Sequence, residues 1–204
     1  KYLYASELAI KKYRELSTCV DCDFEDKEAY LFTVRDKSKI ETEAAALSKL
    51  GIAPKIVEKS GLPIKILSAL KFEHQAQFDP LKFLYGLNKG FKIYENSKVI
   101  SVKGNCVSTE KGRIIARKIV IATHYPIINR YGLYFTKMYQ QRAHVISLSG
   151  AAEVGGMYLD EDSSGLSFRN HGELLLIGTQ GKKTGSGTCA WDGLRKFAGK
   201  AFPN

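Results

Sequence analysis

The pattern of apolar and polar residues predicts both amphipathic helices and short strands along this chain. Apolar residues recur at helical spacing over 2–16 and 38–50, and Ser38 and Glu41 have the spacing of a capping box. Gly51 follows the second helix, where a left-handed cap is expected. A third helix is predicted to begin at Asp79-Pro80, because Asp is a favoured N-cap and Pro fits the first helical position.

Strand-like runs fill much of the remaining chain. Residues 20–24 and 29–34 are predicted to form a hairpin about the Glu25-Asp26-Lys27 turn, and further strands are predicted at 63–67, 69–78, 139–148, 156–159, 166–169 and 173–177. A turn at Asn170-His171-Gly172 joins the last two. The sequence therefore predicts an α+β fold, with an antiparallel sheet flanked by helices.

A separate group of short strands lies between residues 98 and 126. Residues 99–102 and 106–109 flank Gly104-Asn105, and 113–115 follows, which predicts a small antiparallel β-meander. The apolar run 119–122 then precedes Thr-His-Tyr-Pro and predicts a buried strand that ends in a polar loop. Such a loop end is where a ligand can bind, although a meander followed by an apolar strand occurs in many folds.

The glycine-rich segment Gly178-x-x-Gly181-x-Lys183-x-Gly185 follows an apolar strand. Glycine allows a ligand to approach the backbone closely, so this segment is a second candidate binding element. Phosphate binding is one option, but the full Walker pattern is missing. The alternative is that Lys182 and Lys183 are an ordinary exposed pair.

Composition and charge narrow the function classes. The 204 residues are 44% hydrophobic, enough for one substantial core, and no apolar run approaches the roughly twenty residues of a membrane span. The net charge is +10, but the lysines are spread along the chain without a basic stripe interleaved with aromatics. No nucleic-acid or membrane partner is therefore predicted. A noncatalytic module that binds an anionic partner stays open as an alternative.

The cysteines and histidines predict no metal site. Four cysteines are too few and too scattered for a disulfide framework, and Cys19-Val-Asp-Cys22 lacks a second pair that would complete four zinc ligands. The histidines show no metal spacing. Reduced thiols and the absence of a recognisable signal peptide lead us to expect a cytoplasmic protein.

The order of these motifs resembles the FAD-dependent oxidoreductases of the glycine oxidase, D-amino-acid oxidase and monomeric sarcosine oxidase family. That family has a lysine-valine strand, a meander and a strand ending in Ala-Thr-Gly, which correspond to Lys98-Val99, the meander and Ala122-Thr123, with His124 where glycine is commoner. The resemblance implies an internal fragment. Its expected parts are substrate domain at 1–76 and 131–186, part of the FAD domain at 77–130, and a truncated helix at 187–204.

The resemblance also implies roles for single residues. Val99, Ala122, Thr123 and Gly181 would contact FAD, and Lys183 would be catalytic, because an ammonium beside the flavin stabilises charge developing on dioxygen. Arg169 and Arg142 are the candidates for binding a substrate carboxylate, unless they are exposed structural arginines.

The activity implied by the resemblance is oxidation of the C–N bond of a small-molecule amine or amino acid by hydride transfer to flavin. Oxidase and dehydrogenase both stay open. No G-x-G-x-x-G motif occurs, so we expect the fragment to be inactive and not to retain FAD. The ending Gly-Lys-Lys-Thr-Gly, Trp191 and Phe-Pro203 is similar to a bacterial subgroup that sometimes carries a Rieske domain, so the parent chain is a candidate for one.

Overall fold

The computed structural model describes residues 2–125, 127, 133–162, 165–186 and 190–203, and the chain divides into two compact units. Unit 1 consists of Lys1–Lys89, Arg142–Lys182 and Ser186–Asn204. Unit 2 consists of Gly90–Gln141 and Lys183–Gly185. These units are defined by packing, and the division into substrate and FAD domains stays a prediction.

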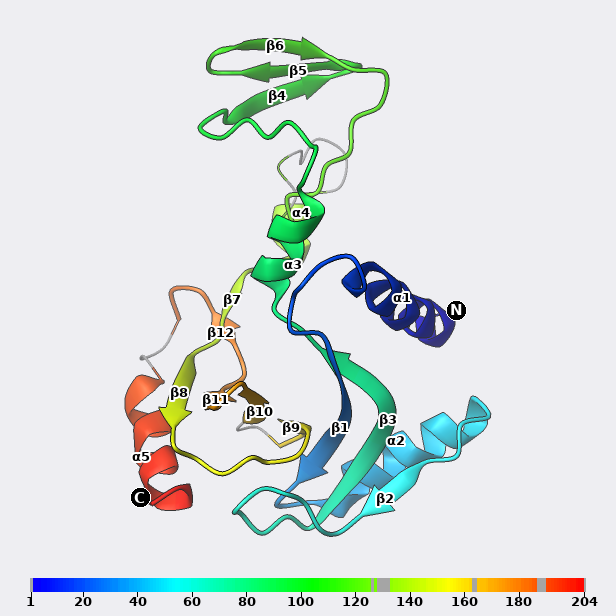
Figure 1. The fold of residues 1–204 in the computed structure, drawn as a ribbon, viewed down its shortest axis with the longest axis vertical. Coiled ribbons are helices and arrows are strands. Elements are labelled where there is room, and N and C mark those ends of the chain that lie inside the picture. The colour runs from blue at the N-terminus through cyan, green and yellow to red at the C-terminus, as the bar shows by residue number, and fades with distance from the viewer. Residues whose placement is uncertain (1, 126, 128–132, 163–164, 187–189, 204) are drawn as a thin grey trace. The chain divides into compact units, whose positions relative to one another are not determined.

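A seven-stranded sheet forms the centre of unit 1 (Figure 1). Its strand order is β2-β3-β1-β9-β10-β11-β8, and all its pairs are antiparallel except β1 with β9. The strands are β1 (Glu25–Thr33), β2 (Lys55–Val57), β3 (Ser68–Gln77), β8 (Val145–Ser149), β9 (Met157–Asp160), β10 (Ser167–His171) and β11 (Leu174–Gly178). The predicted sheet flanked by helices is confirmed, with one parallel pair that was not predicted.

Two helices cover opposite faces of this sheet. Helix α2 (Lys37–Lys49) buries Ile40 and Leu47 against Leu70 of β3, on one face. Helix α5 (Trp191–Ala201) buries Leu194 with Phe168 and other residues of the main core, on the opposite face. Because side chains alternate along a strand, β1 contributes to both clusters.

Helices α1 (Tyr2–Ser17) and α3 (Pro80–Leu87) complete unit 1. They contribute Leu16, Phe83 and Leu87 to a third apolar cluster around the buried side chains of Val20 and Cys22. No helix in the described ranges is both long and apolar enough to cross a bilayer.

The helix ends partly match the predictions. Asp79 caps α3 as predicted, since its Oδ1 accepts from the amides of Leu81 and Lys82 at 2.8 and 3.1 Å. Gly51 has the predicted left-handed backbone, with φ of +81°. Ser38 is not the cap of α2; Asp36 takes that place and accepts from the Ser38 amide at 2.9 Å.

Unit 2 contains the predicted meander. Strands β4 (Val99–Lys103), β5 (Cys106–Thr109) and β6 (Gly112–Ile115) form a three-stranded antiparallel sheet. A short helix, α4 (Tyr134–Lys137), follows it. Strand β7 (Gln141–Arg142) is the hydrogen-bonded neighbour of β12 (Lys182–Lys183) in a separate two-stranded sheet.

Several predicted strands are wrong. In place of the proposed hairpin over 20–34 there is a single strand, β1, which runs through the Glu25-Asp26-Lys27 segment because these residues pair with β3. Residues 63–67 are not a strand, and the predicted strand at 139–148 is interrupted between β7 and β8. Helix α5 ends at Ala201, two residues before Pro203, and the predicted truncation of this helix stays a prediction.

The predicted buried strand at 119–122 is also wrong. Those residues have no regular secondary structure, and the side chains of Val120 and Ile121 are 87% and 47% exposed. A strand needs hydrogen-bonding neighbours, and no described strand pairs with this run. Within the described ranges, none of the fully buried apolar side chains belongs to unit 2. Its apolar residues therefore lack a core of their own.

Candidate functional site

Arg169 lies on a face of the central sheet that carries no helix at this point. The pairing of Arg169 with Leu176, and of Ser167 with Leu159, puts these side chains on the face opposite the main core. On this face helix α2 packs mainly against β1 and β3. Leu159 is 52% exposed, so this part of the sheet presents apolar surface around an arginine.

Arg169 is a half-buried residue, and its guanidinium makes no hydrogen bond or ion pair with another described residue. By contrast, the guanidinium of Arg14 binds Asp26 at 2.5 Å, and Arg195 lies 3.9 Å from Asp192. A half-buried guanidinium without an internal acceptor retains its capacity to bind a carboxylate with two parallel hydrogen bonds. Arg169 is therefore the strongest candidate ligand-binding residue in unit 1.

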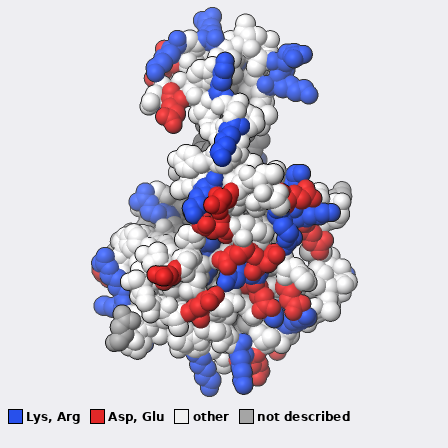
Figure 2. Space-filling view, in the orientation of Figure 1, with Lys and Arg blue, Asp and Glu red and all other residues white. Residues whose placement is uncertain are grey.

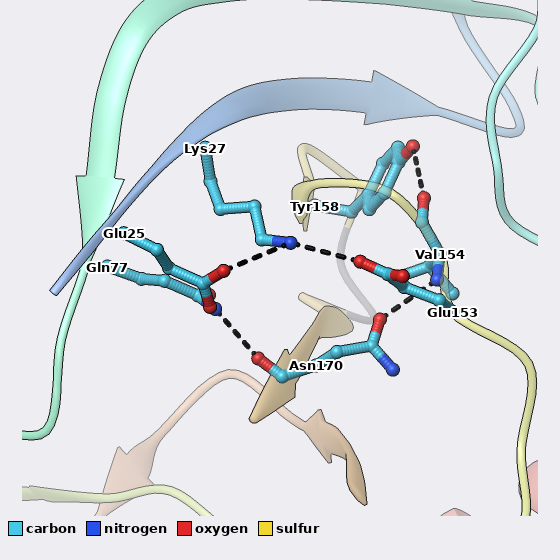
Figure 3. A network of polar contacts seen from close by, with 7 residues as sticks. All are labelled: Glu25, Lys27, Gln77, Glu153, Val154, Tyr158 and Asn170. Atoms are coloured by element: carbon cyan, nitrogen blue, oxygen red, sulfur yellow. Dashed lines mark hydrogen bonds and ion pairs between the residues drawn. The ribbon is translucent and has the colours of Figure 1, made fainter. Parts of the chain in front are cut away.

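A polar network holds the strand that carries Arg169 (Figure 3). Asn170, the next residue of β10, points to the other face; its Oδ1 accepts from the Val154 amide at 2.9 Å and its carbonyl accepts from Gln77 Nε2 at 2.9 Å. Lys27 lies between Glu25 and Glu153, at 3.3 and 3.0 Å. Its hydrogen bond to Glu153 raises the pKa of the Lys27 ammonium. The network fixes β10 against β1 and β3, and sequence reasoning missed it.

Tyr158 adds a buried link on that same face. Its hydroxyl donates to the Val154 carbonyl and accepts from the Gly61 amide, both at 3.0 Å. Burial raises the pKa of the Tyr158 hydroxyl, because the charged phenolate is poorly solvated there.

The glycine-rich segment begins where β10 and β11 lie close together. A Cβ at Gly178 would lie 2.6 Å from the Ser167 hydroxyl, and one at Gly165 would lie 2.3 Å from the Gln180 Cβ. Thr179 follows, and its Oγ1 is the single buried side-chain polar atom without a hydrogen-bond partner among the described residues. Gly181 is half-buried in the same segment. An orphaned hydroxyl beside closely packed glycines fits one wall of a ligand site.

Lys183 and Arg142 lie on the small two-stranded sheet. Arg142 is exposed at the end of β7, next to β12. Lys183 Nζ lies 5.8 Å from the centre of the Tyr139 ring, and the Thr184 amide donates to the Gln140 carbonyl at 2.9 Å. The cation–π contact and this pairing orient the Lys183 side chain.

The other predicted cofactor residues belong to unit 2. Val99 opens β4, while Ala122 and Thr123 are exposed; Thr123 Oγ1 donates to the Tyr125 carbonyl at 2.8 Å. His124 has a φ of +61°, a left-handed conformation that glycine adopts most readily. His124 thus keeps the backbone geometry expected of a glycine at this place.

The predicted site residues are divided between the two units. Arg142, Arg169 and Gly181 belong to unit 1, and Val99, Ala122, Thr123 and Lys183 to unit 2. Thr123 and Lys183, which sequence reasoning expected to converge on one flavin, share a compact unit. Their convergence on a ligand stays a prediction.

The structure also contains two groups of neighbouring polar residues that the sequence did not indicate. Asp160 and Asp162 are only 6% and 7% exposed, and Asp162 accepts from Thr33 and the Val34 amide. Asp23, Asp79 and His171 have ligand atoms within 4.8 Å of one another. Lys82 already binds Asp23 at 2.7 Å and Asp79 caps α3, so this group has a structural role.

Comparison with known proteins shows the family to which this chain belongs. The family of FAD dependent oxidoreductases matches residues 2–204, and the chain belongs to this family. FAD is the family's cofactor. The chain is 32% identical over 184 residues to the putative Rieske 2Fe-2S iron-sulfur protein YhfW of Bacillus subtilis (strain 168), covering 82% of this chain and 36% of that protein.

Solved structures show the same fold. Glycine oxidase from Geobacillus kaustophilus superposes with a TM-score of 0.74 at 15% identity, covering 98% of this chain and 61% of the enzyme. L-proline dehydrogenase from P. horikoshii gives a TM-score of 0.70 at 17% identity, covering 97% and 61%. The chain thus spans about 36% of its curated relative and 61% of these enzymes.

Proposed function

We propose that this chain forms the substrate-binding region and part of the FAD site of an enzyme that oxidises the C–N bond of an amino acid or related amine. Membership of the FAD dependent oxidoreductases supports the redox chemistry. Two similar structures are named for glycine and L-proline, which supports an amino-acid substrate.

The observation that carries the substrate class is the half-buried guanidinium of Arg169, with its exposed apolar surroundings. An amino acid has a carboxylate that matches a guanidinium fork and, beside it, an amine-bearing carbon with little polarity. The apolar side chains of Leu159 and Leu176 provide a surface for that carbon skeleton. Arg142, which is exposed on β7, stays a second candidate for binding the carboxylate.

The residues present fit one part of an FAD site. The close-packed glycines at 165 and 178 and the unpartnered Thr179 hydroxyl fit a ligand wall, while the chain contains no G-x-G-x-x-G motif for the pyrophosphate. Val99, Ala122, Thr123 and Gly181 would hold the cofactor. FAD, when bound, accepts the hydride from the substrate carbon. The present chain alone is therefore proposed to be inactive and to bind FAD weakly.

Lys183 is proposed to act after substrate oxidation. Its ammonium is a fixed positive charge, and in an enzyme that uses dioxygen it would stabilise negative charge developing on oxygen. The contact with Tyr139 orients this charge before the reaction. In a dehydrogenase the same lysine would only favour the anionic reduced cofactor.

The name of the Bacillus subtilis relative supports a further proposal, that the complete protein carries a Rieske iron–sulfur domain. The relative contains sequence well beyond the region that this chain matches. A content of two iron and two acid-labile sulfide atoms per complete protein molecule would support a Rieske domain. A complete protein that contains no iron when produced with iron and sulfide supplied would contradict it.

The proposed oxidation is tested by mixing the complete, FAD-loaded protein with glycine, L-proline and other amino acids without oxygen. We expect at least one of them to bleach the visible absorbance of the flavin in a saturable, stoichiometric way. If a broad panel of amino acids and amines all leave the flavin oxidised, while dithionite reduces it, the proposed function is wrong.

A further inference from the structure

The two units differ sharply in charge. Unit 2 holds ten of the 31 Lys and Arg residues in the chain, but only two of the 21 Asp and Glu residues. Unit 1 holds the remaining 21 Lys and Arg residues and 19 Asp and Glu residues. Unit 2 therefore carries +8 of the net charge of +10 in about a quarter of the chain. The lysines are spread evenly, as the sequence indicated, but the acidic residues are not.

The exposed cations of unit 2 also have few acidic residues with which to pair, since Glu95 and Glu110 are the acidic residues of its sequence. In unit 1, by comparison, Lys27, Lys37, Lys55 and Lys71 each contact a glutamate. No described ion pair involves the exposed cations of unit 2 at positions 92, 98, 103, 111, 113, 117, 118 and 137. In Figure 2, the region that carries β4–β6 in Figure 1 shows more Lys and Arg colour than Asp and Glu colour.

The meander separates its basic and apolar side chains onto opposite faces. The register pairs Val102 with Val107, and Val107 with Ile114, so these three share one face. Ser101, Ser108 and Arg113 share the other face, together with Lys103. This second face is polar and basic, apart from Cys106 and Ile115, and the turn Glu110-Lys111 lies at its end.

This arrangement discriminates between kinds of anionic partner. A lipid surface would need several apolar side chains beside the cations, but the apolar trio points away from Lys103 and Arg113, which leaves Ile115 as the exposed large apolar side chain of the described basic face. Single-stranded nucleic acid would need aromatic side chains for base stacking, and β4–β6 contain none. One FAD carries only a pyrophosphate and cannot balance eight charges. A folded acidic surface, with carboxylates spread over a similar area, is complementary to singly spaced cations.

We propose that the basic face of the meander, defined by Ser101, Lys103, Ser108, Lys111 and Arg113, is a docking surface for a protein with a cluster of Asp and Glu residues. The inference rests on charge and strand register and does not depend on the proposed oxidation. Such contacts act mainly by accelerating association and are weakened by salt.

The test compares two charge-reversal variants of the whole chain. One variant carries Lys103→Glu, Lys111→Glu and Arg113→Glu. The matched control carries Lys11→Glu, Lys49→Glu and Lys59→Glu, three exposed lysines of unit 1 without a described ion pair. Both change the net charge equally. Poly-L-glutamate serves as the acidic probe. A single-stranded oligonucleotide and phosphatidylserine vesicles represent the rival partners, nucleic acid and lipid. Circular dichroism confirms that each variant is folded.

We expect the wild type and the unit 1 control to bind poly-L-glutamate alike, with affinity that falls steeply as salt is added. The meander variant should bind roughly 10-fold or more weakly. Equal weakening in both variants would show only a net-charge effect and would overturn the proposal. Tighter binding of the oligonucleotide or the vesicles than of poly-L-glutamate would also overturn it.

Discussion

Gly178 on β11 lies directly opposite Ser167 on β10, and the space for a side chain at position 178 is already filled by the Ser167 hydroxyl. The two residues are paired in the sheet, and an added Cβ would lie 2.6 Å from Ser167 Oγ. The glycine is thus required by close packing at the start of the candidate ligand-binding segment.

Substituting Gly178→Ala should destabilise the protein by about 1–3 kcal/mol, because the new methyl group overlaps Ser167. Urea unfolding followed by circular dichroism measures this. Gly193→Ala is the matched control: a Cβ there meets nothing within 4 Å, and α5 should gain stability from alanine. Adding Ser167→Ala to Gly178→Ala should recover part of the loss. No recovery would show that the hydroxyl is not the obstacle.

Alkaline pH should destabilise unit 1 through Tyr158. Burial raises the pKa of this hydroxyl above the ordinary value of 10.0. A group with a raised folded-state pKa stabilises the fold fully below its unfolded pKa, and this contribution is lost as pH rises through the folded-state pKa. Tyr158→Phe should cost about 1–3 kcal/mol at neutral pH, since the Gly61 amide and Val154 carbonyl lose their partner.

The difference in unfolding free energy between wild type and Tyr158→Phe should then shrink above about pH 10. Denaturant titrations at several pH values measure it. Tyr85→Phe, at a side chain that is 75% exposed, should behave as wild type throughout. A difference that stays constant from neutral to alkaline pH would rule out this assignment.

Lys183 should affect the reaction with dioxygen in an oxidase, and its neighbour should not. In the complete FAD-loaded protein, Lys183→Met should slow reoxidation of the reduced enzyme by roughly 100-fold, because a preorganised charge is lost. Stopped-flow mixing with oxygenated buffer measures this rate. Lys182→Met is the matched control, since successive side chains of a strand point in opposite directions. Similar slowing in both variants would remove Lys183 from its proposed role.

Local signals in the sequence predicted the features that depend on a few neighbouring residues. The meander follows from strand-like runs separated by Gly104-Asn105 and Gly112, and the α3 cap from Asp79-Pro80. Turn and cap geometry is set within about four residues, so short motifs suffice. The family itself was predicted from the order of such motifs.

The failures involve partners that are distant in sequence. Glu25-Asp26-Lys27 looked like a turn, but Lys27 pairs with Glu153, 126 residues away, and β9 supports the strand. The network around Asn170 also has no local signal. In contrast, 119–122 looked like a buried strand but has no described partner. Hydrophobic pattern shows that a segment is suited to burial, whereas a strand also needs a neighbour.

The central claim is that Arg169 binds the carboxylate of an amino-acid substrate. The direct measurement is kcat/KM of the complete FAD-loaded protein for an amino acid that reduces the flavin and for the amine that lacks only its carboxylate. Arg35→Leu, at an exposed arginine without an ion pair among described residues, is the control.

We expect Arg169→Leu to lower kcat/KM for the amino acid about 10- to 150-fold, the value of a charge-assisted hydrogen bond, and to leave kcat/KM for the amine nearly unchanged. The Arg35→Leu protein should match wild type with both substrates. If Arg169→Leu lowers both values equally, or neither, then Arg169 does not bind the carboxylate and the account of the site is contradicted.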